Sequence, residues 1–200
     1  MLKDLDKTLK ELLKRELPSD FVSSVGVDGE LDESDSQPQV EISFAPPDSQ
    51  FSTQVKLPAI GLFLYDIREN LELRNGAWSI ERQSNGTAVK QRPPARVDCS
   101  YLVTAWPQNP SDFETEHLLL GEVMKVLLRY RKLPHNVLQG SLKQQEAPVG
   151  AVTLRPSLLN SLGEFWQAIG GKPKAMLNYT VTIAVSLDEV VEPLPLVVNS

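Results

Sequence analysis

The hydrophobic and polar positions of the chain repeat with two periods, one of about 3.6 residues, typical of helices, and one of two residues, typical of strands. The first helical stretch covers residues 1–17 and ends before Pro18, which predicts an amphipathic helix. Its apolar stripe consists of Leu2, Leu5, Leu9, Leu12 and Leu13. Because such a stripe is unfavourable in water, we expect it to pack on a surface of this subunit or of a neighbour.

Four segments have the two-residue period of strands. Residues 39–45 alternate between apolar and polar positions, and residues 97–106 are largely apolar. Residues 60–67 are apolar on both alternating faces, which predicts an interior strand that is covered on both sides. Residues 175–187 alternate, with an apolar face formed by Leu177, Tyr179, Val181, Ile183 and Val185. Residues 138–142 are predicted as an additional short strand.

Two more helices are predicted in the second half of the chain. Ser111 and Glu114 form a capping box that opens a helix over residues 112–130. Its expected buried stripe is Phe113, Leu120, Met124, Leu127 and Leu128. A second helix over residues 157–169 ends at Gly170 and Gly171, which supply a left-handed C-terminus. Its inward residues are expected to be Leu158, Leu162, Phe165, Trp166 and Ile169.

Two segments are expected outside the main packing. Residues 69–92 are a long polar excursion in which Asn85 and Gly86 predict a hairpin turn between arms at residues 77–83 and 87–92. A loop of this length is either mobile or a contact device. Residues 188–200 are an apolar tail that Pro193 and Pro195 keep extended.

These elements predict an α+β fold with a mixed, largely antiparallel sheet flanked by helices, an N-terminal helix and an extended C-terminal tail. The domain organisation expected is an N-terminal helix with an acidic loop at residues 1–38, one domain at residues 39–187, and the tail from residue 188.

Charge is unevenly spread along the 200 residues, which carry a net charge of −6. Residues 28–48 hold seven acids and no Lys or Arg, a balance of −7, whereas residues 68–96 hold six bases and three acids, a balance of +3. An acidic chain is a poor general binder of nucleic acid, so none is expected as a partner. The basic segment either meets an acidic partner or is a solvated loop. No apolar run is long enough to predict membrane insertion.

The candidate chemical groups form no catalytic or metal-binding pattern. His117 and His135 lack metal-ligand spacing, and Cys99 lies in an apolar strand, where a structural role is expected. The acidic run at residues 28–35 lacks the spacing of a calcium loop. A single cysteine allows no internal disulfide and favours synthesis in a reducing cytoplasm. No cofactor, no metal and no enzymatic activity are therefore expected.

Six motifs carry a family resemblance that covers residues 39–187. They span residues 63–70, 73–75, 98–106, 116–121, 162–171 and 179–185. In this order they resemble the tube-terminator, or cap, proteins of contractile injection systems of the antifeeding prophage and Photorhabdus virulence cassette type. Those proteins are similar in role to phage tail terminators.

The resemblance implies a structural protein that forms a homo-hexameric ring on the distal end of an inner tube. Such a ring ends tube growth and links the tube to the sheath, so the expected partners are the inner-tube protein and the sheath protein. Assembly is expected in the cytoplasm, within a particle that is either released or membrane-associated. The alternative is an adaptor or regulatory binding domain that does not assemble.

Particular residues are expected to serve these roles. Contact with the tube or with a neighbouring subunit is assigned to four arginines of the basic segment: Arg68, Arg74, Arg82 and Arg92. Strand pairing with the sheath is assigned to the tail residues Val190, Val191, Leu194, Leu196, Val197 and Val198. The alternative for the tail is packing on its own domain. The core is expected to include Trp166, Phe165, Tyr179 and Leu120.

Overall fold

The computed structural model describes residues 1–18, 40–74, 76, 79–82, 87–156, 159, 161–186 and 194–195. Of residues 79–82, 87–91 and 194–195 only the backbone is described. The acidic loop expected at residues 28–38 lies outside the described residues, as do Val190, Val191, Leu196, Val197 and Val198 of the tail.

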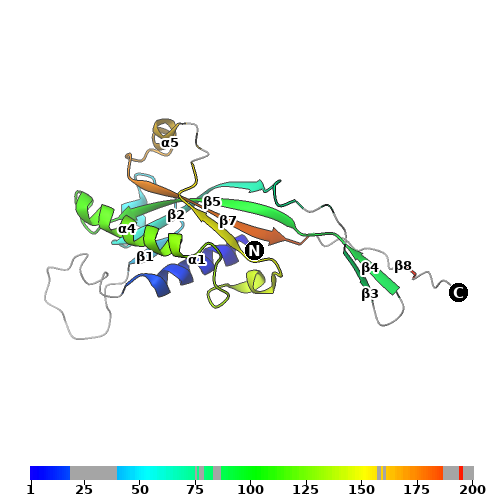
Figure 1. Ribbon diagram of the computed structural model, residues 1–200. Helices are drawn as coiled ribbons and strands as arrows, with labels where there is room; N and C mark the ends of the chain where they lie inside the picture. Colours follow the sequence, from blue (N-terminus) through cyan, green and yellow to red (C-terminus); the bar gives the residue numbers. More distant parts are fainter. Residues whose placement is uncertain are drawn as a thin grey trace.

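A five-stranded sheet lies at the centre, in the order β1-β2-β5-β7-β6 (Figure 1). The strands are β1 (Glu41–Ser43), β2 (Ala59–Glu69), β5 (Ala95–Trp106), β7 (Met176–Val185) and β6 (Gly150–Thr153). The pair β1–β2 is parallel and the other pairs are antiparallel. The expected α+β fold with a mixed, largely antiparallel sheet is confirmed. The strands predicted at residues 60–67, 97–106 and 175–187 are its three interior strands, β2, β5 and β7.

The expectation that β2 is covered on both sides holds only for its first half. Ala59, Ile60 and Leu62 are fully buried, whereas Ile67 is half-exposed. The register of β2 against β5 shifts between Leu64 and Asp66, which marks a bulge. Beyond this bulge the strand residues change from half-buried to exposed, and Ile67 is the apolar residue among them.

Two helices cover one face of the sheet, α1 (Leu2–Glu16) and α4 (Phe113–Arg129) (Figure 1). In α1 the predicted leucine stripe is buried except for Leu2, which is exposed at the first turn. The stripe forms one hydrophobic core with α4 and with the apolar face of β5 and β7. The surface that covers α1 therefore belongs to this chain.

The buried side of α4 differs from the prediction. Leu120 and Leu127 are buried, but Phe113 is 64% exposed and Leu128 is 48% exposed. The buried positions are Glu116, Leu119, Leu120, Val123, Val126 and Leu127. The cap also differs, because Asp112 and not Ser111 accepts the hydrogen bond from the backbone N–H of Thr115, at 3.0 Å. Glu116 is buried in this helix. A prediction based on apolar positions alone could not include it, because glutamate is polar.

The opposite face of the sheet carries a short helix, α5 (Leu162–Ala168), which begins at the cap Ser161. It is shorter than predicted, and Leu158 lies outside the described residues. Trp166 is buried and Phe165 is half-buried, whereas Leu162 is exposed. Gly170 has a φ of 66°, which confirms the left-handed helix end. A Cβ on Gly171 would lie 2.8 Å from the backbone oxygen of Pro47, so this position needs glycine for a close approach.

The short strand predicted at residues 138–142 is wrong, because residues Gly140–Gln144 form a 3₁₀ helix, η1. The side chain of Asp4 in α1 accepts hydrogen bonds from the backbone N–H of Ser141 at 3.2 Å and from its hydroxyl at 2.8 Å. Leu138 and Leu142 are buried four residues apart. The turn is therefore fixed by contacts with α1, which a local strand pattern cannot reveal.

One more short helix is α3 (Phe51–Gln54). The ring of its residue Phe51 stacks on that of Trp106, with centroids 4.3 Å apart.

A second sheet extends the three interior strands beyond one end of the molecule. It contains β3 (Ser79–Arg82), β4 (Thr87–Gln91) and β8 (Leu194–Pro195), in the order β3-β4-β8. Along the chain, β3 follows β2, β4 precedes β5 and β8 follows β7, so the second sheet repeats the strand order of the first. We call β3, β4 and β8 the arm (Figure 1). The predicted hairpin is confirmed by the antiparallel pairing of β3 with β4. Its turn residues lie outside the described residues.

Substitution of Trp166 by alanine is expected to lower the free energy of unfolding by about 3–5 kcal/mol, as removal of a buried aromatic side chain usually does. Trp166 is 4% exposed, and its ring packs edge-on against Phe165 with centroids 5.5 Å apart. Leu162→Ala, in the same helix at a side chain 44% exposed, is the control and should cost about 1 kcal/mol or less. A denaturant titration that gives the two variants equal stability would contradict this packing.

The carboxyl group of Asp6 predicts a pH dependence of stability. The hydroxyl of Tyr101 donates a hydrogen bond to Asp6 Oδ1 at 2.9 Å. Burial raises the pKa of Asp6, and the hydrogen bond from Tyr101 opposes this increase. A raised pKa contributes stability that is present below the ordinary pKa and is lost as the pH rises through the raised value. Asp6→Asn keeps an acceptor for Tyr101, so its stability relative to wild type should increase from about pH 4 to about pH 7.

Asp4 supplies the control with the opposite sign. Hydrogen bonds from Ser141 lower the pKa of Asp4, so its contribution is present at neutral pH and is lost as the pH falls. Asp4→Asn should therefore lose stability relative to wild type most at neutral pH. Parallel pH profiles for the two variants, from denaturant titrations, would contradict both assignments.

Candidate partner-binding surface

The second face of the sheet is polar and only partly covered. Strand side chains alternate, so the partners of the core residues of β5 and β7 point to this face. They include Asp98, Ser100, Asn178, Thr180 and Thr182. α5 covers one end of the face, where the rings of Phe63 and Phe165 lie with centroids 6.4 Å apart. The rest of the face is open between α5 and the turn that follows β2.

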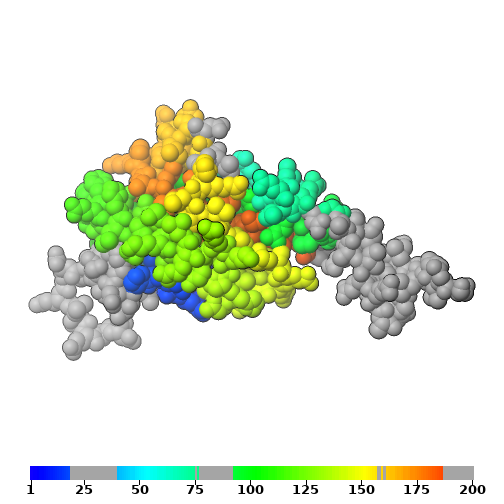
Figure 2. Space-filling view, in the orientation of Figure 1, coloured from blue at the N-terminus to red at the C-terminus, as the bar shows by residue number. Residues whose placement is uncertain are grey.

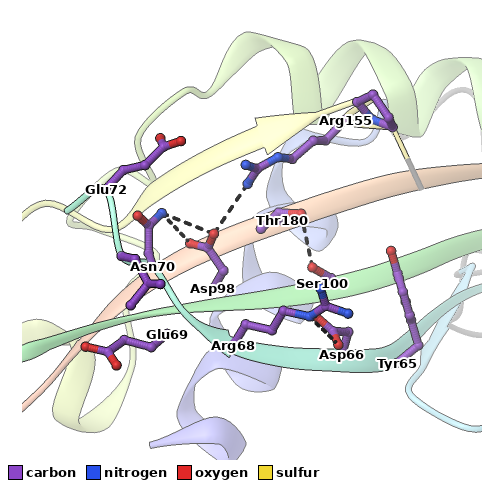
Figure 3. Close-up of a pocket in the computed structure, with 12 residues that line it drawn as sticks. Tyr65, Asp66, Arg68, Glu69, Asn70, Glu72, Asp98, Ser100, Arg155 and Thr180 are labelled. Atoms are coloured by element: carbon purple, nitrogen blue, oxygen red, sulfur yellow. Dashed lines mark hydrogen bonds and ion pairs between the residues drawn. The ribbon is translucent and has the colours of Figure 1, made fainter. Parts of the chain in front are cut away.

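Two neighbouring cavities lie on this face, and together we call them the groove. The first, of about 280 Å³, lies between the turn after β2 and the segment after β6 (Figure 3). The second, of about 450 Å³, lies beside α5 and is lined by Leu162, Trp166, Pro173 and Met176. They meet where the hydroxyl of Tyr65 donates a hydrogen bond to Asn178 Oδ1 at 3.0 Å. One end of the groove is thus polar and the other is largely apolar.

Asp98 connects four chain segments at the polar end (Figure 3). Its oxygens accept hydrogen bonds from Asn70 Nδ2 at 3.1 Å each and from Thr182 Oγ1 at 2.6 Å, and Arg155 lies 3.3 Å away as an ion-pair partner. A partly buried carboxylate requires such donors to offset its lost hydration. This role of Asp98 was not predicted, although an aspartate within an otherwise apolar strand is a signal that the sequence contains.

Acidic groups are in excess along the polar end. Four carboxylates, of Asp66, Glu69, Glu72 and Asp98, and two guanidinium groups, of Arg68 and Arg155, line the first cavity. Arg68 Nε donates a hydrogen bond to Asp66 Oδ1 at 3.0 Å. It also lies 2.9 Å from Oδ2, but Oδ2 is buried and accepts no hydrogen bond.

A buried ion pair joins the two faces of the sheet. Lys174, in the segment between α5 and β7, hydrogen-bonds to Glu116 in the first turn of α4. The side chains are 12% and 4% exposed, and the ammonium group lies 4.7 Å from the ring centroid of Trp106. The positive end of the α4 dipole also favours a carboxylate at this position. The pair fixes α4 relative to the groove wall. It was not predicted from the sequence, because Glu116 and Lys174 are 58 residues apart.

The arginines expected to bind a partner lie around the polar end of the groove and on the arm. Arg68 pairs with Asp66, and Arg74 pairs with Glu69 at 3.3 Å. Arg92 is exposed, and Arg82 belongs to β3, of which only the backbone is described. Because Arg68 and Arg74 each have an acidic neighbour, these two do not form a continuous positive surface.

The tail is described at one point, where the backbone of Leu194 pairs with Ala88 and that of Pro195 pairs with Thr87 of β4. In this structure the tail therefore adds as a short strand to the chain's own hairpin. Of the other residues assigned to the core, Tyr179 and Leu120 are buried.

The remaining candidate groups lie apart from the groove. His117 and His135 are exposed, and Cys99 is fully buried, where burial raises the pKa of its thiol to about 11. A thiol with this pKa is not a nucleophile at neutral pH. Within the described ranges, no three metal-ligating side chains form a group that could hold a metal ion. None of the helices described there is long and apolar enough to cross a membrane.

Comparison with known proteins supports the resemblance carried by the sequence motifs. The chain is similar to the sheath/tube terminator of an extracellular contractile injection system, named PVC, in its extended state. The identity is 26% and the TM-score 0.66, with 100% of this chain and 62% of that chain covered. It is also similar to the tube-terminating cap of the anti-feeding prophage, with 27% identity, a TM-score of 0.63, and 100% and 60% coverage.

The chain thus spans about three fifths of the length of these two relatives. None of the curated proteins matches it. A family model described as the Pvc16 N-terminal domain matches residues 4–200, which include α1 and the tail as well as the segment that carries the motifs. The expected family relationship is therefore confirmed, and the chain belongs to the Pvc16 N-terminal domain family.

Proposed function

We propose that this chain is a structural cap that ends the inner tube of a contractile injection particle and links the tube to the sheath. The observation that carries the proposal is the similarity of the whole chain to a sheath/tube terminator and to a tube-terminating cap, at 26% and 27% identity. A cap acts by covering the growing end and needs no catalytic group. This agrees with the exposed histidines and the buried, unreactive thiol of Cys99.

The partners of such a cap are the inner-tube protein, the sheath protein and other copies of the chain. We propose a ring of six copies, because the motifs of this chain resemble those of hexameric caps. The particle is proposed to assemble in the cytoplasm and to be of the extracellular type, because one similar protein is the terminator of an extracellular contractile injection system.

Two parts of the chain are assigned to these contacts. Arg68, Arg74, Arg82 and Arg92 are proposed to meet the tube or a neighbouring copy, since they lie at the base of the arm and on it. The tail is proposed to pair with an edge strand of the sheath. Its short pairing with β4 supports a capacity for strand addition, and the same contact supports the alternative that the tail stays on its own domain.

A strain without this protein is expected to make tubes and sheaths of variable length, because nothing covers the growing end. Particle lengths measured by negative-stain electron microscopy check this, with the deletion complemented by the wild-type gene as control. Particles of normal, uniform length in the deletion strain would reject the cap role and favour an adaptor that does not assemble.

Two variants are expected to separate tube binding from sheath binding. Arg74→Glu combined with Arg82→Glu should weaken assembly on tubes, whereas truncation after Asp188 should keep tube binding and lose sheath. Arg74 and Glu69 are both exposed, so breaking their pair should change the melting temperature little. Each variant is tested in pull-downs with tube protein and with sheath protein. The partner whose binding should be unchanged is the control for the partner whose binding should be lost. Equal recovery of both partners by either variant would reject the corresponding assignment.

A further inference from the structure

Two uncovered surfaces of the described chain lie on opposite faces of the sheet. α4 packs its buried side on the apolar face, so its outer side points away from the molecule (Figure 2). The groove between α5 and the turn after β2 lies on the other face. In one chain these two surfaces cannot meet.

The outer side of α4 combines apolar residues with an ordered charge distribution. Leu118 and Leu128 are exposed there, among the exposed side chains of His117, Lys125 and Arg129. Apart from adjacent residues and the helix's own backbone, no atom lies within 4 Å of the place where a Cβ on Gly121 would be. Glu114 lies at the start of the helix, and the exposed bases Arg131 and Lys132 follow its end. The helix therefore presents an acidic end, a mixed middle in which Leu118 and Leu128 lie among charged side chains with open space at Gly121, and a basic end.

The groove has the complementary distribution. Its apolar part contains Leu162 and Met176, with Val152 exposed on the neighbouring edge strand β6. Lys172, which is exposed, lies next to this part. Glu69 and Glu72 line the opposite end, where Glu69 also pairs with Arg74 of its own chain.

We propose that the groove of one copy receives α4 of a second copy. Leu118 and Leu128 of the helix lie over Leu162 and Val152, and the bases Arg131 and Lys132 point to Glu69 and Glu72. The start of the helix then lies toward Lys172, which fixes its direction. This inference rests on the proposed assembly of copies and specifies the surfaces that make it.

The contact is head-to-tail, because each copy offers the helix on one face and the groove on the other. Two different patches on opposite faces do not form a two-fold dimer, and repetition of the contact gives a ring or a filament. The buried pair of Lys174 with Glu116 holds the helix and the groove wall in one rigid body. Each added copy therefore takes the same angle to the previous copy.

Variants of Gly121 test the docking of the helix. Gly121→Arg should fold normally, since the space around this position is open, but its side chain should block the contact and raise the dissociation constant between copies about tenfold or more. Gly121→Ala is the matched control and should associate nearly as the wild type does. Sedimentation velocity over a range of protein concentrations measures association, and circular dichroism verifies the fold.

Charge reversal tests which surfaces meet. One variant carries Glu69→Lys and Glu72→Lys, and the other carries Arg131→Glu and Lys132→Glu. Each alone should associate about tenfold more weakly than wild type or worse, because like charges face each other. An equimolar mixture should regain association, since each groove then meets a helix of opposite charge.

Three results would overturn the inference: a wild-type chain that stays monomeric at all concentrations, a Gly121→Arg variant that associates like wild type, or a mixture of the charge variants that regains nothing. The proposed cap function is judged separately by particle length in the deletion strain. Variable particle lengths together with unaffected association of the variants would leave the cap role intact and reject this interface.

Discussion

The separation of apolar and polar side chains onto the two faces of β5 and β7 is the constraint on which the structure depends. Tyr101 and Tyr179 are opposite each other on the apolar face, and Ser100 and Thr180 are opposite each other on the polar face. Because neighbouring side chains of a strand point to opposite faces, one register fixes both surfaces. The apolar face takes α1 and α4 and forms the core. The polar face forms the wall of a groove.

The connection between these faces depends on charges that are buried inside the protein. Glu116 and Lys174 are removed from water, and each offsets the desolvation of the other. An apolar pair of similar volume can be as stable as a buried ion pair, whereas one partner left alone costs about 3–5 kcal/mol. The value of such a pair lies in its geometry, because only one placement of α4 against the segment after α5 satisfies both groups. The cation–π contact with Trp106 restricts that placement further.

Features with a strong local period could be predicted from the sequence, and features fixed by distant contacts could not. The leucines of α1, the alternation of β7 and the hairpin of β3 and β4 all follow from patterns within about 20 residues. The predicted stripe of α4 omitted Leu119, Val123 and Val126, which are buried, and Glu116, whose burial depends on Lys174 far along the chain. Likewise, the turn at η1 depends on Asp4, and the groove depends on the meeting of Asn70, Asp98 and Arg155. Asn70, Asp98 and Arg155 lie far apart in the sequence and form no local motif, so they come together only in the folded sheet.

A head-to-tail contact has a consequence for the stability of a cap. In an open row each added copy gains one contact and loses translational and rotational freedom. The copy that closes a ring gains two contacts for the same loss, so a closed ring is stable even when a single contact is weak. Copies bound at the end of a tube are already close together, which raises their effective concentration further. Weak contacts, such as those proposed between α4 and the groove, therefore suit the proposed role of a subunit that assembles at a tube end and remains dispersed elsewhere.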